Sequence, residues 1–259
     1  MRIAPAAGTL SAPTWTPEEW AVRVDLAACY RLVAYFGWDD LIATHISVRV
    51  PNTDGHFLLN PLGLMFEEMT ASALVKVDMD GNILEPTTYS VNAAGFTIHS
   101  AVHMAREDAH CVMHLHSVDG TAVSTMAEGI MPLNQKALYV RNQVAYHDYE
   151  GIAFDADERP RLQRDLGDKN LMLLRNHGTL AVGETIADAF LNMYNLERAC
   201  TLQIRTLTGG QPLYPVAQEV IEKVAEQSEK IRSSSYVSRS LVWPAMLRLL
   251  ARHNPGYDA

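Results

Sequence analysis

The sequence has few cysteines and no long apolar run, and each shortage excludes a class of protein. Three cysteines, odd in number and far apart, make no disulfide framework, so we expect Cys29, Cys111 and Cys200 to be buried thiols in a reducing compartment. The first residues lack the uninterrupted apolar stretch of a signal peptide, and no segment approaches membrane-spanning length. These shortages predict a cytoplasmic protein that does not enter a membrane.

Positive charge is also scarce. The chain has 21 lysines and arginines against 30 acidic residues, a formal net charge of −9, and no basic run. Because the phosphates of nucleic acids and anionic headgroups repel an acidic surface, we expect neither nucleic acid nor a membrane surface as a partner. The glycines form no dinucleotide-binding or Walker-type phosphate loop, and there is no Gly-x-Ser-x-Gly turn.

The chain is nevertheless long enough for one large core, because 48% of its 259 residues are apolar. Apolar periodicity and turn residues predict helices over residues 16–37, 93–106, 119–126 and 185–207, and short strands over 45–50, 57–60, 74–77, 111–116, 171–174 and 179–182. The strands do not alternate regularly with helices. This pattern predicts an α/β fold with a mixed or antiparallel sheet layered with helices, and not a doubly wound parallel sheet.

Two histidines lie on one face of a predicted strand. In the segment Cys-Val-Met-His-Leu-His, His114 and His116 are two residues apart, and strand side chains alternate between faces. Two imidazoles on one face suit two ligand positions of a tetrahedral or octahedral metal site. Such pairs also occur in strands that bind no metal, so the pattern requires a third ligand.

His177 is the candidate for the third ligand. It follows a strongly apolar strand, and Gly178 after it permits the backbone to approach other groups closely. A tight corner of this kind can direct a side chain into a cleft. The other interpretation is a hydrogen-bonded corner histidine without a ligand.

Further titratable residues allow more than one interpretation. His99 and His103 are four residues apart on a predicted helix and share a face; His103 fits a surface or capping role, and His99 fits either a structural or a site role. Tyr146 and His147, in the segment Tyr-His-Asp-Tyr, could present a tyrosine acid or a His-Asp pair, or could form an aromatic strand edge.

Taken together, residues 90–124 and 144–207 resemble the class II aldolase/adducin family, in which a His-x-His strand and a downstream His-Gly corner hold a metal. The Asn-His-Gly context and the separation of 61 residues between His116 and His177 (177 − 116) carry the resemblance. It implies that His114, His116 and His177 bind a divalent metal ion, with zinc first and manganese, cobalt, nickel or iron as alternatives. Residues 94–100 and 144–149 are more similar to the adducin head and its bacterial relatives than to the sugar-phosphate aldolases.

The resemblance also implies an architecture. The expected fold is class II aldolase-like: a central, mostly antiparallel sheet flanked by helical layers, assembled as a homotetramer with sites at subunit interfaces. The expected domain spans residues 16–210. Residues 1–15 are expected to form a flexible tail, and residues 211–259 a helical arm that packs on the same domain or on a neighbouring subunit.

Departures from the sugar-phosphate aldolases affect substrate and proton transfer. Those enzymes place a catalytic Glu or Asp nineteen residues before the first metal histidine, where this chain has Gly95 (114 − 95 = 19). Their phosphate-binding Ser-Ser and Gly-Asn pairs are replaced by residues 93–94 (Ala-Ala) and 44–45 (Thr-His). A non-phosphorylated substrate is therefore expected, with His99 or Tyr146 as the candidate catalytic residue that moves the proton.

Three functions fit these features. The preferred one is a metal-dependent lyase that cleaves an aldol or decarboxylates a small hydroxy-carbonyl or hydroxy-acid substrate through a metal-stabilised enediolate. An adducin-like, non-catalytic binding or scaffold protein is the first alternative. A non-haem Fe(II) oxygenase on the same scaffold is the second, because three imidazoles can also hold Fe(II) and leave room for oxygen.

Overall fold

The computed structural model describes residues 15–151 and 156–259, without the side chains of residues 93–97 and 156. The described helices are α1 (Pro17–Tyr35), α2 (Ala93–Ala105), α3 (Val118–Ser124), α4 (Gln135–Arg141), α5 (Arg159–Leu166), α6 (Ile186–Thr208), α7 (Gln218–Arg232) and α8 (Trp243–His253). The described strands are β1 (His45–Arg49), β2 (Phe57–Leu59), β3 (Val75–Val77), β4 (Cys111–Leu115), β5 (Val144–His147), β6 (Leu171–Leu174) and β7 (Gly178–Gly183).

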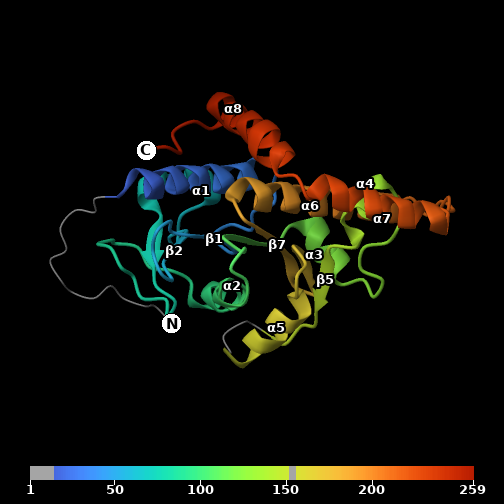
Figure 1. The fold of residues 1–259 in the computed structure, drawn as a ribbon, viewed down its shortest axis with the longest axis horizontal. Helices are drawn as coiled ribbons and strands as arrows, with labels where there is room; N and C mark the ends of the chain where they lie inside the picture. The colour runs from blue at the N-terminus through green and yellow to red at the C-terminus, as the bar shows by residue number, and fades with distance from the viewer. Residues whose placement is uncertain (1–14, 152–155) are drawn as a thin grey trace.

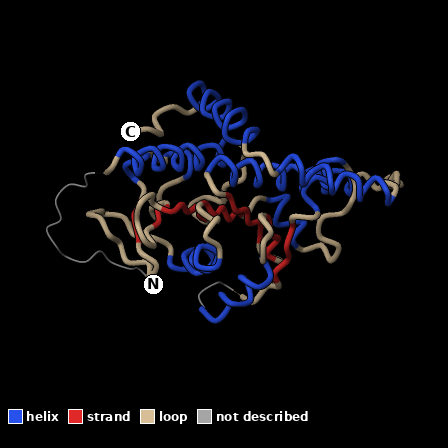
Figure 2. The backbone as a smooth tube through the Cα atoms, viewed as in Figure 1, coloured by secondary structure: helices blue, strands red, loops and turns tan. Residues whose placement is uncertain are grey.

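The strands form one seven-stranded sheet in the order β3-β2-β1-β4-β7-β6-β5. All neighbouring pairs are antiparallel except β5 and β6, which are parallel. The sheet lies between helices (Figure 2). The predicted α/β fold with a mostly antiparallel, helix-flanked sheet is therefore confirmed.

Two helical layers cover the two faces of the sheet. Helices α1 and α6 lie on one side and α2 and α5 on the other (Figure 1). The larger apolar core lies on the α1/α6 side and includes Phe190, Met113 and Ile46. A smaller core on the α2/α5 side includes Val112 and Ile98. Because Val112 and Met113 are adjacent in β4, strand alternation alone separates the two cores.

Local sequence explains how the first helix begins. Thr16 adopts an extended conformation, and its hydroxyl accepts a hydrogen bond from the Glu19 N–H at 3.2 Å. Pro17 occupies the first turn, where backbone N–H groups have no carbonyl partner within the helix, so the N–H that proline lacks costs no hydrogen bond. The helix ends at Tyr35, and Gly37 then adopts a positive φ of 68°.

The C-terminal segment returns to α1. Arg31 donates hydrogen bonds to the side chain of Asn254 and the carbonyl of Pro255, and the indole of Trp243 donates to Asp25. These contacts hold α8 against the domain (Figure 1).

Among the described residues, no helix combines the length and the apolar character that crossing a membrane requires.

Candidate metal centre

Strands β4 and β7 bring the three candidate ligands together. His114 lies in β4, His116 directly follows it, and His177 precedes β7, which pairs antiparallel with β4. Asn176 turns the corner with a positive φ of 58°. A Cβ at Gly178 would lie 2.3 Å from the Leu115 carbonyl oxygen, so only glycine permits this approach.

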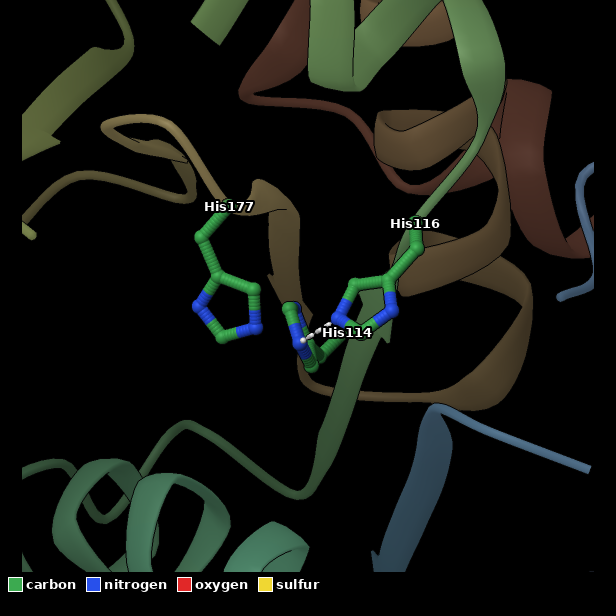
Figure 3. Close-up of side chains that lie close together, drawn as sticks. All are labelled: His114, His116 and His177. Carbon is green, nitrogen blue, oxygen red and sulfur yellow. Dashed lines mark hydrogen bonds between the residues drawn. The ribbon is translucent and has the colours of Figure 1, made fainter. Parts of the chain in front are cut away.

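The three imidazoles converge on one point (Figure 3). Their possible ligand atoms all lie within 4.8 Å of one another, and the Nε2 atoms of His114 and His116 are 3.1 Å apart. Ligands bound to one tetrahedral zinc ion at about 2.0–2.1 Å lie roughly 3.3 Å apart. The spacing of His114 and His116 is thus close to that of two ligands of one ion.

Hydrogen bonds orient two of the rings. His114 donates from Nδ1 to the Thr179 carbonyl at 3.0 Å, and Nδ1 of His116 lies 3.2 Å from an Asp40 carboxylate oxygen. A neutral imidazole carries one ring hydrogen, and because Nδ1 of His114 uses it for the Thr179 carbonyl, Nε2 of His114 presents a lone pair toward Nε2 of His116. Imidazole nitrogens are ordinary ligands of divalent metals, and three of them lie close together here, so the donor set fits a divalent metal ion.

The electrostatics keep the rings of His114 and His177 neutral. Burial, followed by the charge of His116, lowers the pKa of His177 to about 4. Burial also holds the pKa of His114 well below its usual value, with neighbouring histidines adding to the effect. Because metals bind the unprotonated ring, His114 and His177 can bind a metal at neutral pH without first losing protons.

A buried carboxyl group supports the site from α6. Glu197 is 1% exposed and accepts hydrogen bonds from the hydroxyls of Ser117 and Thr179. Burial raises its pKa to about 7. Glu197 was not predicted from the sequence, although its spacing from Met193 and Cys200 puts it on the buried face of the helix.

The structure brings His99 near the candidate metal centre and leaves Tyr146 on the other face of the sheet. His99 lies in α2, and its ring centroid is 5.7 Å from that of His45, which pairs with His114 across β1 and β4. The hydroxyl of Tyr146 instead accepts a hydrogen bond from the Ile130 N–H at 3.1 Å. Its ring packs against the α1/α6 core.

The structure locates one other predicted feature and leaves a second outside the described residues. His147 contacts Asp165 and Glu158 at 2.8 and 3.2 Å, and is thus paired with two carboxylates on and beside α5. The side chains around Gly95, where the sugar-phosphate aldolases place their carboxylate, lie outside the described residues.

Residues 24–204 match the family model of the Class II Aldolase and Adducin N-terminal domain. The chain belongs to the class II aldolase/adducin family. The resemblance seen in the sequence is thereby confirmed. A crystal structure of an aldolase II superfamily protein from Pseudomonas syringae is 48% identical, covers 95% of this chain and 98% of that one, and superposes with a TM-score of 0.90.

Other relatives include both adducins and sugar-phosphate aldolases. The alpha-adducin of Rattus norvegicus is 47% identical over 74% of this chain, which spans only 26% of the adducin. The L-fuculose 1-phosphate aldolase from Glaciozyma antarctica is 27% identical, with 94% and 96% of the two chains covered and a TM-score of 0.76. Membership in the family suggests lyase activity and dependence on a divalent metal, and leaves the reaction and substrate open.

Proposed function

We propose that this protein is a zinc-dependent lyase that cleaves an aldol or decarboxylates a small, non-phosphorylated hydroxy-carbonyl or hydroxy-acid substrate. The convergence of His114, His116 and His177, with the Nε2 atoms of His114 and His116 3.1 Å apart, is the observation that carries the proposal. A metal ion bound there would stabilise the negative charge that develops on substrate oxygens when a bond to carbon breaks. Neutral ligands suit this role because they leave the charge of the ion undiminished.

The replacement of the residues that bind phosphate in the sugar-phosphate aldolases supports a non-phosphorylated substrate. The Gly-Asn and Ser-Ser pairs of the sugar-phosphate aldolases are replaced here by residues 44–45 (Thr-His) and 93–94 (Ala-Ala). Burial lowers the pKa of His45 to about 4, so this ring carries no positive charge at neutral pH. A phosphate dianion would lose its solvation here without gaining a cationic partner from His45.

We assign proton transfer to His99. Gly95 has no side chain that can carry a proton, and the Tyr146 hydroxyl is directed to the opposite face of the sheet. His99 lies on the same face as His114 and is 1% exposed. Burial lowers the pKa of His99 well below its usual value, so the ring is neutral at neutral pH and has one nitrogen without a hydrogen.

The assembly is part of the proposal. We infer a homotetramer, as the family resemblance implies. Exposed apolar side chains beside the metal centre agree with this inference, because Val118 is 83% and Leu41 69% exposed in the single chain.

An adducin-like binding role is the second candidate. The identity to rat alpha-adducin, 47%, exceeds the 27% identity to the L-fuculose 1-phosphate aldolase from Glaciozyma antarctica. Retained histidines do not separate the two functions by themselves, because a bound metal can also be structural.

The test is a product screen with zinc-loaded protein. Hydroxy acids and hydroxy-carbonyl compounds, each with and without a phosphate group, are incubated with the wild type, and released aldehyde and CO2 are measured. We expect product from a non-phosphorylated compound, lost after chelation and in His177→Ala, and kept in His110→Ala, a variant at an exposed histidine. Zinc-loaded protein that releases neither product from any compound would favour the adducin-like role.

A further inference from the structure

Buried polar atoms without a partner gather beside the candidate metal centre. They are the Thr44 hydroxyl, both ring nitrogens of His45 and Nε2 of His99. Seven such atoms occur among the described residues, and four of them belong to this one group. Buried polar groups are normally hydrogen-bonded, so a group of unpaired ones points to a ligand that completes them.

The backbone at this point is also strained. Thr44 has a φ of 68°, a left-handed conformation that β-branched residues avoid, and it is 1% exposed. Strained backbone of this kind is concentrated at ligand-binding and catalytic sites. Thr44 directly precedes His45, and His45 pairs with His114 across β1 and β4, so the unpaired atoms border the candidate metal centre.

A chain of hydrogen bonds fixes which nitrogen of His99 carries the hydrogen. His103 contacts the Ala109 carbonyl through Nδ1 at 2.7 Å, and a carbonyl only accepts, so Nδ1 of His103 donates. Burial lowers the pKa of His103 to about 3, so the ring is neutral and its Nε2 must accept. The donor for this Nε2 is the Ser47 hydroxyl at 2.7 Å.

The same logic continues to His99. Because the Ser47 hydroxyl gives its hydrogen to His103, its oxygen accepts from Nδ1 of His99 at 2.6 Å. A neutral imidazole has no second hydrogen, so Nε2 of His99 is a lone pair. Ser47 and His103 are both buried, at 1% and 2% exposure, so water does not compete for these bonds.

We propose that Thr44, His45 and His99 form a subsite for a neutral, hydroxyl-bearing part of the substrate, with Ser47 and His103 as positioning residues that fix the His99 tautomer. The inference rests on the proposed function for the identity of the ligand as substrate. A hydroxyl group both donates and accepts, so it can donate to the His99 lone pair and accept from Thr44 or His45. A phosphate dianion only accepts, and its oxygens would face that lone pair.

The test reads the tautomer of His99 directly. Zinc-loaded protein labelled with nitrogen-15 in histidine is studied by long-range proton–nitrogen NMR, with His99→Gln to assign the signals. We expect a hydrogen on Nδ1 and a bare Nε2 at His99 in the wild type. Ser47→Ala should convert His99 to a mixture of tautomers, whereas Ser228→Ala, which removes an equally buried hydroxyl on α7, should change nothing. A wild-type His99 with its hydrogen on Nε2 would overturn the proposal.

Two probes then test the subsite. Glycerol represents a neutral polyol and inorganic phosphate an anion. We expect glycerol to shift the His99 Nε2 signal saturably and phosphate to leave it unchanged. A shift with phosphate alone, or with neither probe, contradicts the subsite. Zinc content is measured on the same samples, so loss of the metal centre, which would count against the proposed function, is distinguished from failure of the subsite.

Discussion

The two faces of the central sheet differ in what they bury. On the α1/α6 face, β1 and β4 contribute Ile46 and Met113 to a continuous apolar core. On the α2/α5 face, the same two strands contribute His45, Ser47 and His114, and both ring nitrogens of His45 lack partners. Because successive residues of a strand point to opposite faces, the same strands place apolar side chains in the core on one face and polar side chains in the candidate site on the other.

The large apolar core explains why the fold can tolerate unpaired polar groups beside the candidate metal centre. Each buried polar atom without a partner costs about 1–3 kcal/mol. Burial of a Phe or Leu side chain contributes about 1.5–3 kcal/mol, and the apolar face contains many of them, Phe190 and Leu196 included. The apolar face therefore offsets the free-energy cost of the unpaired polar atoms on the α2/α5 face.

The largest expected effect comes from breaking the apolar face alone. Phe190 is fully buried against Phe36, Trp38 and Trp243. We expect Phe190→Ala to lower the free energy of unfolding by about 3–5 kcal/mol, measured by urea denaturation. Zinc bound per folded chain should not change. Tyr214→Ala, at a side chain that is 95% exposed, is the control and should change stability by less than about 0.5 kcal/mol.

If Phe190→Ala also removed zinc from protein that is still folded, zinc binding on the α2/α5 face would depend on packing in the α1/α6 core, contrary to this prediction.

A smaller effect is expected at Glu197, which lies on α6 and contacts Thr179, the residue whose carbonyl accepts a hydrogen bond from His114. Burial raises its pKa to about 7, so between its ordinary value of 4.5 and that value the folded protein holds a proton that the unfolded chain releases. Stability should therefore fall as the pH rises through this window. We expect the wild type to lose about 1–3 kcal/mol relative to Glu197→Gln across it, measured by denaturation at several pH values.

The exposed Glu222→Gln serves as the matched control and should follow the wild type. Parallel pH curves for the wild type and Glu197→Gln would show that this carboxyl group titrates normally.

The smallest expected effect concerns the candidate metal centre on the α2/α5 face. Asp40 contacts Nδ1 of His116 at 3.2 Å and orients the ring. Carboxylate partners of this kind typically contribute about 10–100-fold to metal affinity; because Asp40 is half exposed, we expect about tenfold weaker zinc binding in Asp40→Asn. Competition with a chelator measures it. Asp39→Asn, at the neighbouring carboxylate, should bind zinc as the wild type does, and equal losses in both variants would point to net charge instead of orientation.

Sequence predicted most of the fold because most elements carry their own signal. Helix α6 has 23 residues, and β4 and β7 alternate or run apolar, so their positions could be predicted from local pattern. Helices α4 and α5, with seven and eight residues, were not predicted. The N-cap of α4, Asn134, was the available signal.

The candidate site was predictable only in part. The spacing of His114, His116 and His177 is visible in the sequence, and the structure brings all three together. The roles of Asp40 and Ser47 were not predictable, because each contacts a histidine more than fifty residues away in the chain. Such pairings depend on the register of β1 and β4, which no local pattern specifies.

The metal content of the protein tests the central claim most directly. Wild-type protein purified without a metal-affinity tag is compared with His114→Ala, His177→Ala and the exposed-site control His110→Ala by elemental analysis. We expect about one equivalent of zinc per chain in the wild type and the control, and almost none in the other two variants. Folded wild-type protein that carries no metal and takes up none when zinc is added would contradict the account.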